Sequence, residues 1–168
     1  MFQNSMDDFW CGVQHPNLVH REGRAMLGKH LIVELHGVSP ELLNDLERLR
    51  KILLDAAIKA SATIIGDVFH KFSPHGVTGV IAVKESHISI HTWPEFGYAA
   101  LDIFTCRNID PVKALEIIIE EMKPKYHIVM NVSRGEPYVE EFDNEESEVS
   151  KSSSEVTIER IVVQGHKN

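Results

Sequence analysis

The reactive side chains of this chain concentrate in one short segment, residues 84–95 (KESHISIHTWPE), and a cysteine follows at Cys106. Alternate side chains of a strand share one face, so His87, Ser89 and His91 would lie side by side. Three polar groups on one face are costly to bury unless that face is wet or functional. The segment therefore indicates either a solvated sheet face or a chemical site, and no separated Ser-His-Asp triad pattern accompanies it.

Two runs of alternating residues, 87–93 and 98–106, flank a four-residue loop and predict a β-hairpin. If the residues that flank the loop pair with each other, Cys106 falls opposite Glu85 and next to Ser86. The thiol would then lie beside the peptide bond that joins Glu85 to Ser86. A bulge in the loop would shift this register by one or two residues.

The elements that must position this segment follow from hydrophobic periodicity. Alternating and β-branched runs predict strands, and apolar residues at helical spacing predict two amphipathic helices. The predicted order is strand 30–36, helix 42–60, strands 62–72, 77–83, 87–93 and 98–106, helix 110–122 and strand 126–132. This order implies an α+β fold, a two-layer α/β sandwich with helices on one face of a mainly antiparallel sheet.

Length, charge and cysteine content narrow the class of protein. The chain has 168 residues, a formal net charge of −8 and two cysteines. The length predicts one globular domain, and the acidic balance argues against nucleic-acid binding, because phosphates require a basic surface. Two cysteines are too few for a disulfide framework, no apolar run is long enough to cross a membrane, and signal-peptide features are missing. A cytoplasmic location is therefore expected.

Composition also divides the chain into three parts. Residues 1–27 show neither alternation nor a helical stripe and predict an N-terminal extension. Residues 28–135 are expected to form the folded domain. Residues 136–168 predict an acidic, disordered tail, in which 156–164 could add a short strand without a defined partner. Eight acidic residues and one lysine lie in 136–155, so most of the net charge belongs to the tail and says little about a ligand.

The segment around Ser86 resembles a known family. Residues 85–95 (ESHISIHTWPE), followed by 97–100 (GYAA) and 102–106 (DIFTC), are similar to the prokaryotic S-adenosylmethionine decarboxylase proenzymes, which are self-processing pyruvoyl enzymes. The resemblance extends over about residues 28–134. A run of this length is far more specific than a spaced motif.

The resemblance implies that the chain cleaves itself. The hydroxyl of Ser86 would attack the carbonyl of Glu85 to give an ester, and elimination and hydrolysis would leave a pyruvoyl group at position 86. His91 would be the proton acceptor in this processing. Thr78, at a position where the family usually has serine, would hold the intermediate. The products would be chains of 85 and 83 residues.

The resemblance also implies a decarboxylase. The pyruvoyl ketone would form a Schiff base with the amine of S-adenosylmethionine, release CO2 and give the aminopropyl donor for spermidine synthesis. Cys106 would be the proton donor in catalysis, and Glu95 and Phe72 would contact the substrate. Relatives with the same machinery act on arginine or ornithine, and an inactive homologue that regulates an active partner is a further alternative. The self-processing motif does not distinguish arginine or ornithine from S-adenosylmethionine.

Further expectations concern assembly, geometry and metals. Members of this family assemble as two copies of each cleaved chain, and a second copy packed on the sheet would cover its polar face. Five residues of straight strand span roughly 16 Å, so His91 reaches Ser86 only if the chain bends just after Ser86, and we expect such a bend. No metal site is expected, because Cys11, His15 and His20 lack a fourth ligand nearby.

Overall fold

The structure is a computed structural model that describes residues 19–21, 24–106, 109–135 and 159–164. For residues 19–21, 24–26 and 159–164 only the backbone is described. The expected acidic segment 136–155 lies outside the described residues.

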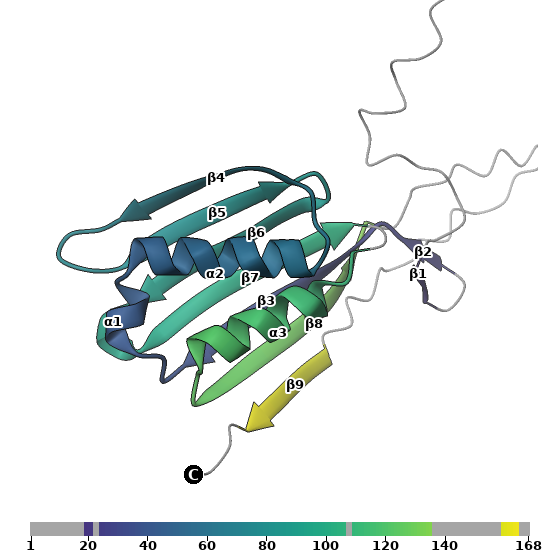
Figure 1. Ribbon diagram of the computed structural model, residues 1–168. Helices are drawn as coiled ribbons and strands as arrows, with labels where there is room; N and C mark the ends of the chain where they lie inside the picture. The colour runs from purple at the N-terminus through teal and green to yellow at the C-terminus, as the bar shows by residue number, and fades with distance from the viewer. Residues whose placement is uncertain (1–18, 22–23, 107–108, 136–158, 165–168) are drawn as a thin grey trace, which may run out of the picture.

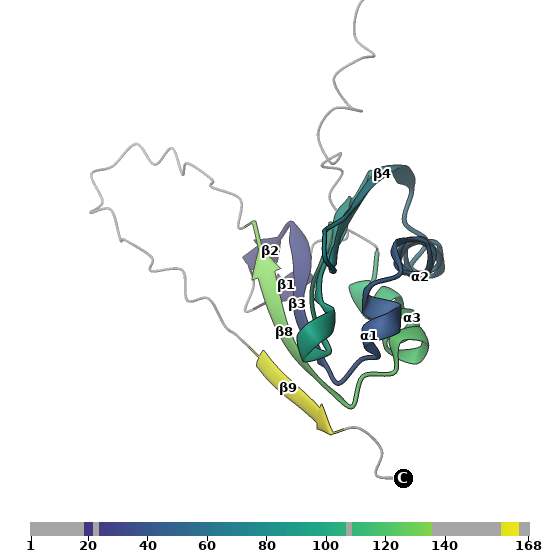
Figure 2. The same ribbon diagram turned by 90° about the vertical axis from the view of Figure 1, so that its left-hand side faces the viewer.

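One antiparallel sheet forms a complete layer of the fold, with strands in the order β4-β5-β6-β7-β3-β8-β9 (Figure 1). Its strands are β3 (Gly28–His36), β4 (Ile64–Lys71), β5 (Val77–Val83), β6 (Ser86–Trp93), β7 (Tyr98–Cys106), β8 (Tyr126–Arg134) and β9 (Glu159–Gln164). The helices are α1 (Pro40–Leu43), α2 (Leu46–Lys59) and α3 (Pro111–Met122), and all three lie on the same side of the sheet (Figure 2). The α+β sandwich predicted from the sequence is confirmed.

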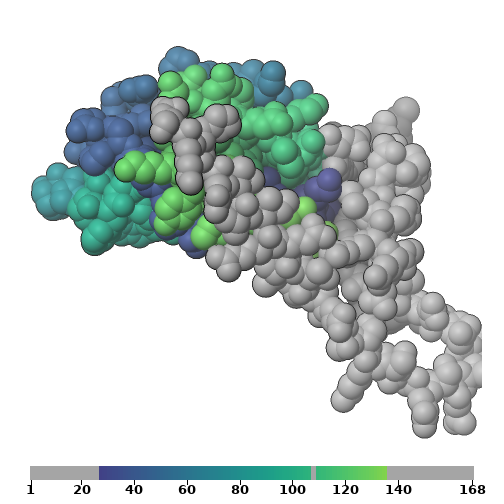
Figure 3. Space-filling model, turned by 90° about the horizontal axis from the view of Figure 1, so that it is seen from below, coloured from purple at the N-terminus to yellow at the C-terminus, as the bar shows by residue number. Residues whose placement is uncertain are grey.

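An apolar core holds the helices on the sheet. Leu31, Val33 and Leu35 of β3 alternate along the strand, face the helices and are almost fully buried. Leu49 and Leu53 of α2 are completely buried in the same cluster. In the space-filling view, the side chains of helices and strands form one packed body (Figure 3). Burial of this apolar surface fixes the orientation of every strand, because a strand turned over would expose its core residues.

The hairpin that carries Ser86 has the predicted register. Strands β6 and β7 pair Trp93 with Tyr98 at the loop end and Ser86 with Thr105 at the open end. The loop contains the short helix η1 (Pro94–Phe96) and closes at Gly97, whose φ of 58° lies in the left-handed region that favours glycine. No bulge shifts the pairing.

The single helix predicted over 42–60 is wrong, because Asn44 and Asp45 divide it into α1 and α2. Asp45 accepts the N–H of Arg48 and so caps the start of α2. The side-chain oxygen of Asn44 accepts the N–H of Gly76 at 3.1 Å. Short polar side chains compete with helical backbone bonds, and here both of them find partners that a continuous helix would not offer.

Strands also occur in two terminal segments. The short strand that residues 156–164 could add is present as β9, over residues 159–164, and the structure supplies the partner that the sequence left undefined, because β9 pairs antiparallel with β8. The edge of a sheet presents unpaired backbone groups, which explains why a β-branched segment joins it there. Within the expected N-terminal extension, β1 (Val19–Arg21) and β2 (Arg24–Met26) pair with each other as a separate two-stranded sheet.

A substitution at Gly79 tests how closely the outer strands β4 and β5 pack. Gly79 lies opposite Phe69 of β4, and a Cβ at this position would overlap the Phe69 ring. We expect Gly79→Ala to reduce stability by about 1–3 kcal/mol, the usual cost of overpacking, which lowers Tm by several degrees. Gly66→Ala is the matched control, since nothing lies within 4 Å of a Cβ there. Equal melting temperatures of the two variants would contradict this packing.

Candidate active site

The site is built where β5 turns into β6. A two-residue turn, Lys84-Glu85, joins these strands, and Ser86 is the first residue of β6, paired with Val83. Cys106, at the end of the neighbouring strand, donates its backbone N–H to the Glu85 carbonyl oxygen at 2.9 Å. The predicted position of Cys106, opposite Glu85 and beside Ser86, is confirmed.

Ser86 is held in an unusual backbone conformation, and the residue before it is fixed by hydrogen bonds. Ser86 has a φ of 145°, a value that side chains with a Cβ rarely adopt, at a cost on the order of 1–3 kcal/mol. Thr63 binds the carboxylate of Glu85 twice, through its N–H at 2.9 Å and its hydroxyl at 3.1 Å. The carbonyl and the carboxylate of Glu85 are thus both fixed, and these contacts help to offset the strain at Ser86.

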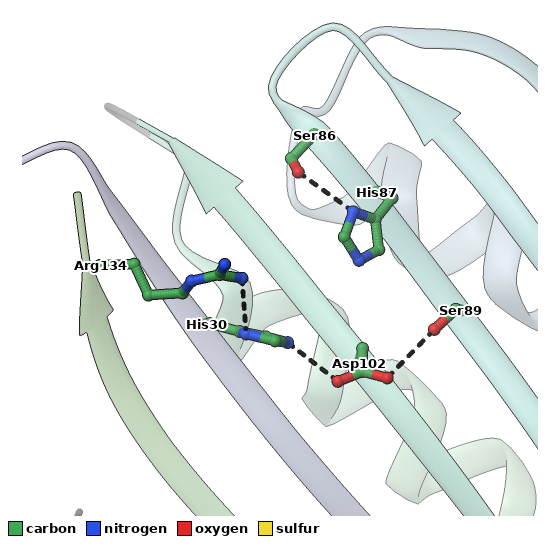
Figure 4. A network of polar contacts seen from close by, with 6 residues as sticks. All are labelled: His30, Ser86, His87, Ser89, Asp102 and Arg134. Carbon is green, nitrogen blue, oxygen red and sulfur yellow. Dashed lines mark hydrogen bonds and ion pairs between the residues drawn. The ribbon is translucent and has the colours of Figure 1, made fainter. Parts of the chain in front are cut away.

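The imidazole of His87 lies against the Ser86 hydroxyl. Ser86 Oγ is 3.1 Å from His87 Nδ1 (Figure 4). The His87 ring is half-buried and lies edge-on to the rings of His30 and Phe104, with centroids 6.4 and 6.0 Å away. Burial lowers the pKa of His87 below its usual 6.5, and the nearby His30 lowers it further. At neutral pH this imidazole is therefore uncharged and can accept a hydrogen bond.

A polar network centred on Asp102 continues from this point across the sheet (Figure 4). The Asp102 carboxylate binds His30 Nε2 at 2.9 Å and accepts from the Ser89 hydroxyl at 3.3 Å. Arg134 lies 3.3 Å from the other ring nitrogen of His30, and its guanidinium stacks on Phe104, 4.6 Å from the ring centroid. These residues lie on the side of the sheet opposite the helices, which we call the helix-free face.

His91 and Thr78 lie together, but they do not lie beside Ser86. They pair across β5 and β6, and Thr78 Oγ1 is 2.5 Å from His91 Nδ1. Strand β6 runs without interruption from Ser86 to Trp93, so the expectation of a bend after Ser86 is wrong. The regular ladder on both sides of β6 keeps it extended, and five residues then span roughly 16 Å. A single chain does not bring His91 to Ser86.

The two residues expected to contact substrate also lie near the His91 end of β6. Glu95, in η1, pairs with Nε2 of His75 at 3.0 Å. An open hollow of about 490 Å³ beside them is lined by Pro40, Glu41, Asn44, His75, Pro94 and Glu95. Phe72 follows β4, is half exposed, and lies edge-on to His70 at 4.8 Å. Within one chain, neither Glu95 nor Phe72 reaches Ser86.

The side chain of Cys106 is half-buried at the end of β7. Its sulfur is disulfide-bonded in this structure. A disulfide sulfur carries no proton, so the proton-donor role implied by the resemblance belongs to the reduced thiol.

The described residues contain neither a cluster of metal ligands nor a membrane-spanning helix. Within 27–106 and 109–135, no group of three or more His, Cys, Asp or Glu residues could hold a metal ion. Cys11 and His15, two of the three ligand-type residues noted in the sequence, lie outside the described part of the chain. None of the helices that the structure describes is long and apolar enough to cross a membrane.

Sequence reasoning missed most of what surrounds Ser86. The alternating pattern identifies His87 only as one of several polar residues on one face of the strand. Nothing in the pattern places His87 Nδ1 beside the Ser86 hydroxyl. Thr63 binds Glu85 across 22 positions of the chain, with no local pattern to link them. The register of the predicted hairpin was the one sequence signal for the network around Asp102, because it places Asp102 opposite Ser89.

Comparisons with known proteins point to one family. A family model described as S-adenosylmethionine decarboxylase matches residues 29–135. The S-adenosylmethionine decarboxylase proenzyme of Thermodesulfovibrio yellowstonii is 50% identical over 110 residues, which cover 65% of this chain and 82% of that protein. The protein of the same name from Pyrococcus horikoshii is 48% identical over 110 residues, which cover 65% of this chain and 79% of that protein. The crystal structure of the Aquifex aeolicus adenosylmethionine decarboxylase matches with a TM-score of 0.62 and 38% identity, covering 71% of this chain and 98% of that chain.

Removal of the Asp102 carboxylate tests the network. Ser89 is only 7% exposed, and its hydroxyl loses its acceptor in Asp102→Ala. We expect the free energy of unfolding to fall by about 1–3 kcal/mol, the cost of an unsatisfied buried group. Asp55→Ala is the matched control, because it removes the exposed ion pair with Lys51 and should change stability by less than about 1 kcal/mol. Equal losses in urea unfolding would show that the network contributes no more than a surface pair.

Proposed function

This chain belongs to the S-adenosylmethionine decarboxylase family, and on that premise we propose that it is a self-processing decarboxylase, cleaved between Glu85 and Ser86. The observation that carries the proposal is the hydrogen bond of 2.9 Å from the Cys106 N–H to the Glu85 carbonyl oxygen. It fixes the carbonyl that the Ser86 hydroxyl attacks, next to a residue with strained φ. The Ser86 hydroxyl, the Glu85 carbonyl and the Cys106 N–H that binds this carbonyl come from adjacent or paired residues. These three groups therefore lie together in every folded copy of the chain.

Cleavage begins when Ser86 Oγ forms a bond to the carbonyl carbon of Glu85. Negative charge develops on the Glu85 oxygen, where the Cys106 N–H stabilises it as one donor of an oxyanion hole. Collapse of the adduct breaks the peptide C–N bond and leaves Glu85 as an ester on the Ser86 hydroxyl. This step also relieves the backbone strain at Ser86. Elimination breaks the Cβ–O bond of residue 86 and releases Glu85 as a carboxylate, and hydrolysis of the resulting dehydroalanine releases ammonia and leaves the pyruvoyl group. The products are chains of 85 and 83 residues.

Position 86 fits the pyruvoyl group that the family carries. The group derives from Ser86 itself, and the neighbouring Glu85 carbonyl is already hydrogen-bonded in the uncleaved chain. A pyruvoyl group supplies an electrophilic carbonyl and an electron sink for decarboxylation, which no ordinary side chain offers. The reduced thiol of Cys106, on the strand paired with β6, holds the proton that returns to the substrate carbon.

We assign His91 and Thr78 to the site of a second copy of the chain. Within one chain they are roughly 16 Å from Ser86, yet they lie on the same helix-free face. That face also exposes Val68 and Val80, which are paired neighbours on β4 and β5 with 75% and 41% of their surface accessible. Exposed apolar groups beside polar ones are typical of a partner surface. A face-to-face homo-oligomer, with two copies of each cleaved chain, would cover this face and bring His91 of one copy to Ser86 of the other.

The substrate assignment follows the relatives, which are named for S-adenosylmethionine. Its sulfonium is cationic, so a carboxylate such as Glu95 and an aromatic face such as Phe72 are the groups proposed to contact it. Both lie near the His91 end of β6, and they reach the shared site from the second copy. A cytoplasmic location is part of the proposal, because a reducing compartment keeps Cys106 as a thiol, the form that the proton-donor role requires.

Intact mass spectrometry of the purified protein tests self-cleavage. Wild type should give two fragments, the second beginning with a pyruvoyl mass, and Ser86→Ala should remain one chain because it lacks the attacking oxygen. The same preparations are assayed under reducing conditions for CO2 release from S-adenosylmethionine, arginine and ornithine. Release from S-adenosylmethionine alone is expected. A wild-type chain that stays single would overturn self-cleavage, and release from arginine or ornithine alone would overturn the substrate.

Mixing two inactive variants tests the shared site. A tagged His91→Ala chain keeps Ser86, and a Ser86→Ala chain keeps His91, so each alone should remain uncleaved. Co-expressed, they form mixed assemblies in which one site has both residues, and the tagged chain should then be cut. Cleavage is measured on a gel from the size of the chain that carries the tag. A tagged chain that stays intact in mixed assemblies, shown to exist by co-purification, would exclude a shared site.

A further inference from the structure

The Ser86 hydroxyl requires a base within reach, and the imidazole that touches it is that of its neighbour. Ser86 Oγ lies 3.1 Å from Nδ1 of His87, within the range for direct proton transfer, whereas His91 of the same chain is roughly 16 Å away along the strand. The His91 of a second copy, proposed above to complete the site, is then the proton acceptor of the later elimination. We infer that His87 is a catalytic residue of self-cleavage, which accepts the Ser86 hydroxyl proton at Nδ1 as Oγ attacks the Glu85 carbonyl. The inference rests on the proposed self-cleavage at this bond.

The structure holds the His87 ring in the orientation that this role requires. Phe104 of β7 lies edge-on to it at 68°, and His30 of β3 lies edge-on at 73°. His30 is itself fixed through both nitrogens, by Asp102 at 2.9 Å and by Arg134 at 3.3 Å. Three neighbouring strands thus restrict the ring, so Nδ1 stays directed at the hydroxyl and the proton of the neutral ring resides on Nε2.

The charged and titratable groups around His87 favour its base form. They are His30 of β3, Asp102 of β7 and Arg134 of β8. Burial lowers the pKa of His87 most, His30 and Arg134 lower it further, and Asp102 acts in the opposite direction. The imidazole is therefore neutral at neutral pH. Its ability to accept a proton is lost as the pH falls through this lowered pKa.

The proton and the bonds balance within the chain. The O–H bond of Ser86 breaks as Nδ1 of His87 takes the proton, and Oγ bonds to the Glu85 carbon. When the adduct collapses, the C–N bond breaks and the same proton passes from Nδ1 to the departing nitrogen of Ser86. The products are an ester and a free amine, and no outside reactant is needed.

Two substitutions test this role in freshly synthesised full-length chain. His87→Asn keeps a hydrogen-bond acceptor near Ser86 but cannot take up a proton, and His87→Ala removes both functions. Each should slow cleavage at least about 100-fold, the usual contribution of a general base. His36→Asn is the matched control, a half-buried histidine on the same face at the other end of β3, packed against Tyr98 and Tyr126. It should be cleaved at the wild-type rate, and unchanged far-UV circular dichroism shows which variants fold.

Hydroxylamine, which cuts esters and leaves amides intact, identifies the step that fails. If His87 activates the hydroxyl, the His87→Asn chain remains whole with and without hydroxylamine. A folded His87→Asn chain cleaved at the wild-type rate would overturn the inference, as would one that accumulates hydroxylamine-sensitive ester, because His87 would then act after the attack. Either result leaves the proposed self-cleavage intact. A wild-type chain that does not cleave would instead overturn the proposed function itself.

Discussion

The self-cleavage proposed for this fold depends on one backbone hydrogen bond, from Cys106 to the carbonyl of Glu85. It lies one residue beyond the last pair of the β6–β7 ladder, Ser86 with Thr105, and its register is set at the other end of the hairpin, where Trp93 pairs with Tyr98. A shift of one residue would turn every side chain of β7 to the opposite face and would withdraw the N–H from this carbonyl. The whole hairpin, and the core beneath it, therefore determines the geometry at a single peptide bond.

The fold assigns stability and reactivity to different faces of the same strands. Residues that face the helices are apolar and nearly inaccessible, such as Ile88 and Ile90 of β6. The residues between them carry imidazole and hydroxyl groups, and Asp102 connects them to the neighbouring strands. Partial burial on this face is enough to keep His87 neutral, whereas full burial of so many polar groups would require a partner for each. The sheet can therefore hold reactive groups without weakening the core.

Local and periodic features of this structure could be predicted from the sequence, and contacts between distant segments could not. The alternation on either side of the loop predicts the β6–β7 hairpin and with it the position of Cys106. The same alternation places His91 far from Ser86, and the structure agrees. The resemblance to a family suggested a bend that would bring the two together, and that expectation was wrong because one chain does not supply the proximity. The two hydrogen bonds from Thr63 to the Glu85 carboxylate depend on where α2 ends relative to the β5–β6 turn. The positive φ of Ser86 is likewise a property of the folded turn and has no signature in residue type.

The strand order has a consequence for the proposed cleavage. Residues up to Glu85 contribute β3, β4 and β5, and residues from Ser86 contribute β6, β7, β8 and β9, yet β3 lies between β7 and β8 in the sheet. Each strand edge of β3 is paired along nine residues with the other fragment. One strand of the first fragment therefore lies between two strands of the second, and neither fragment contains the complete sheet. If the chain is cut after Glu85 as proposed, folding must come first, and the paired strands hold the two pieces together afterwards.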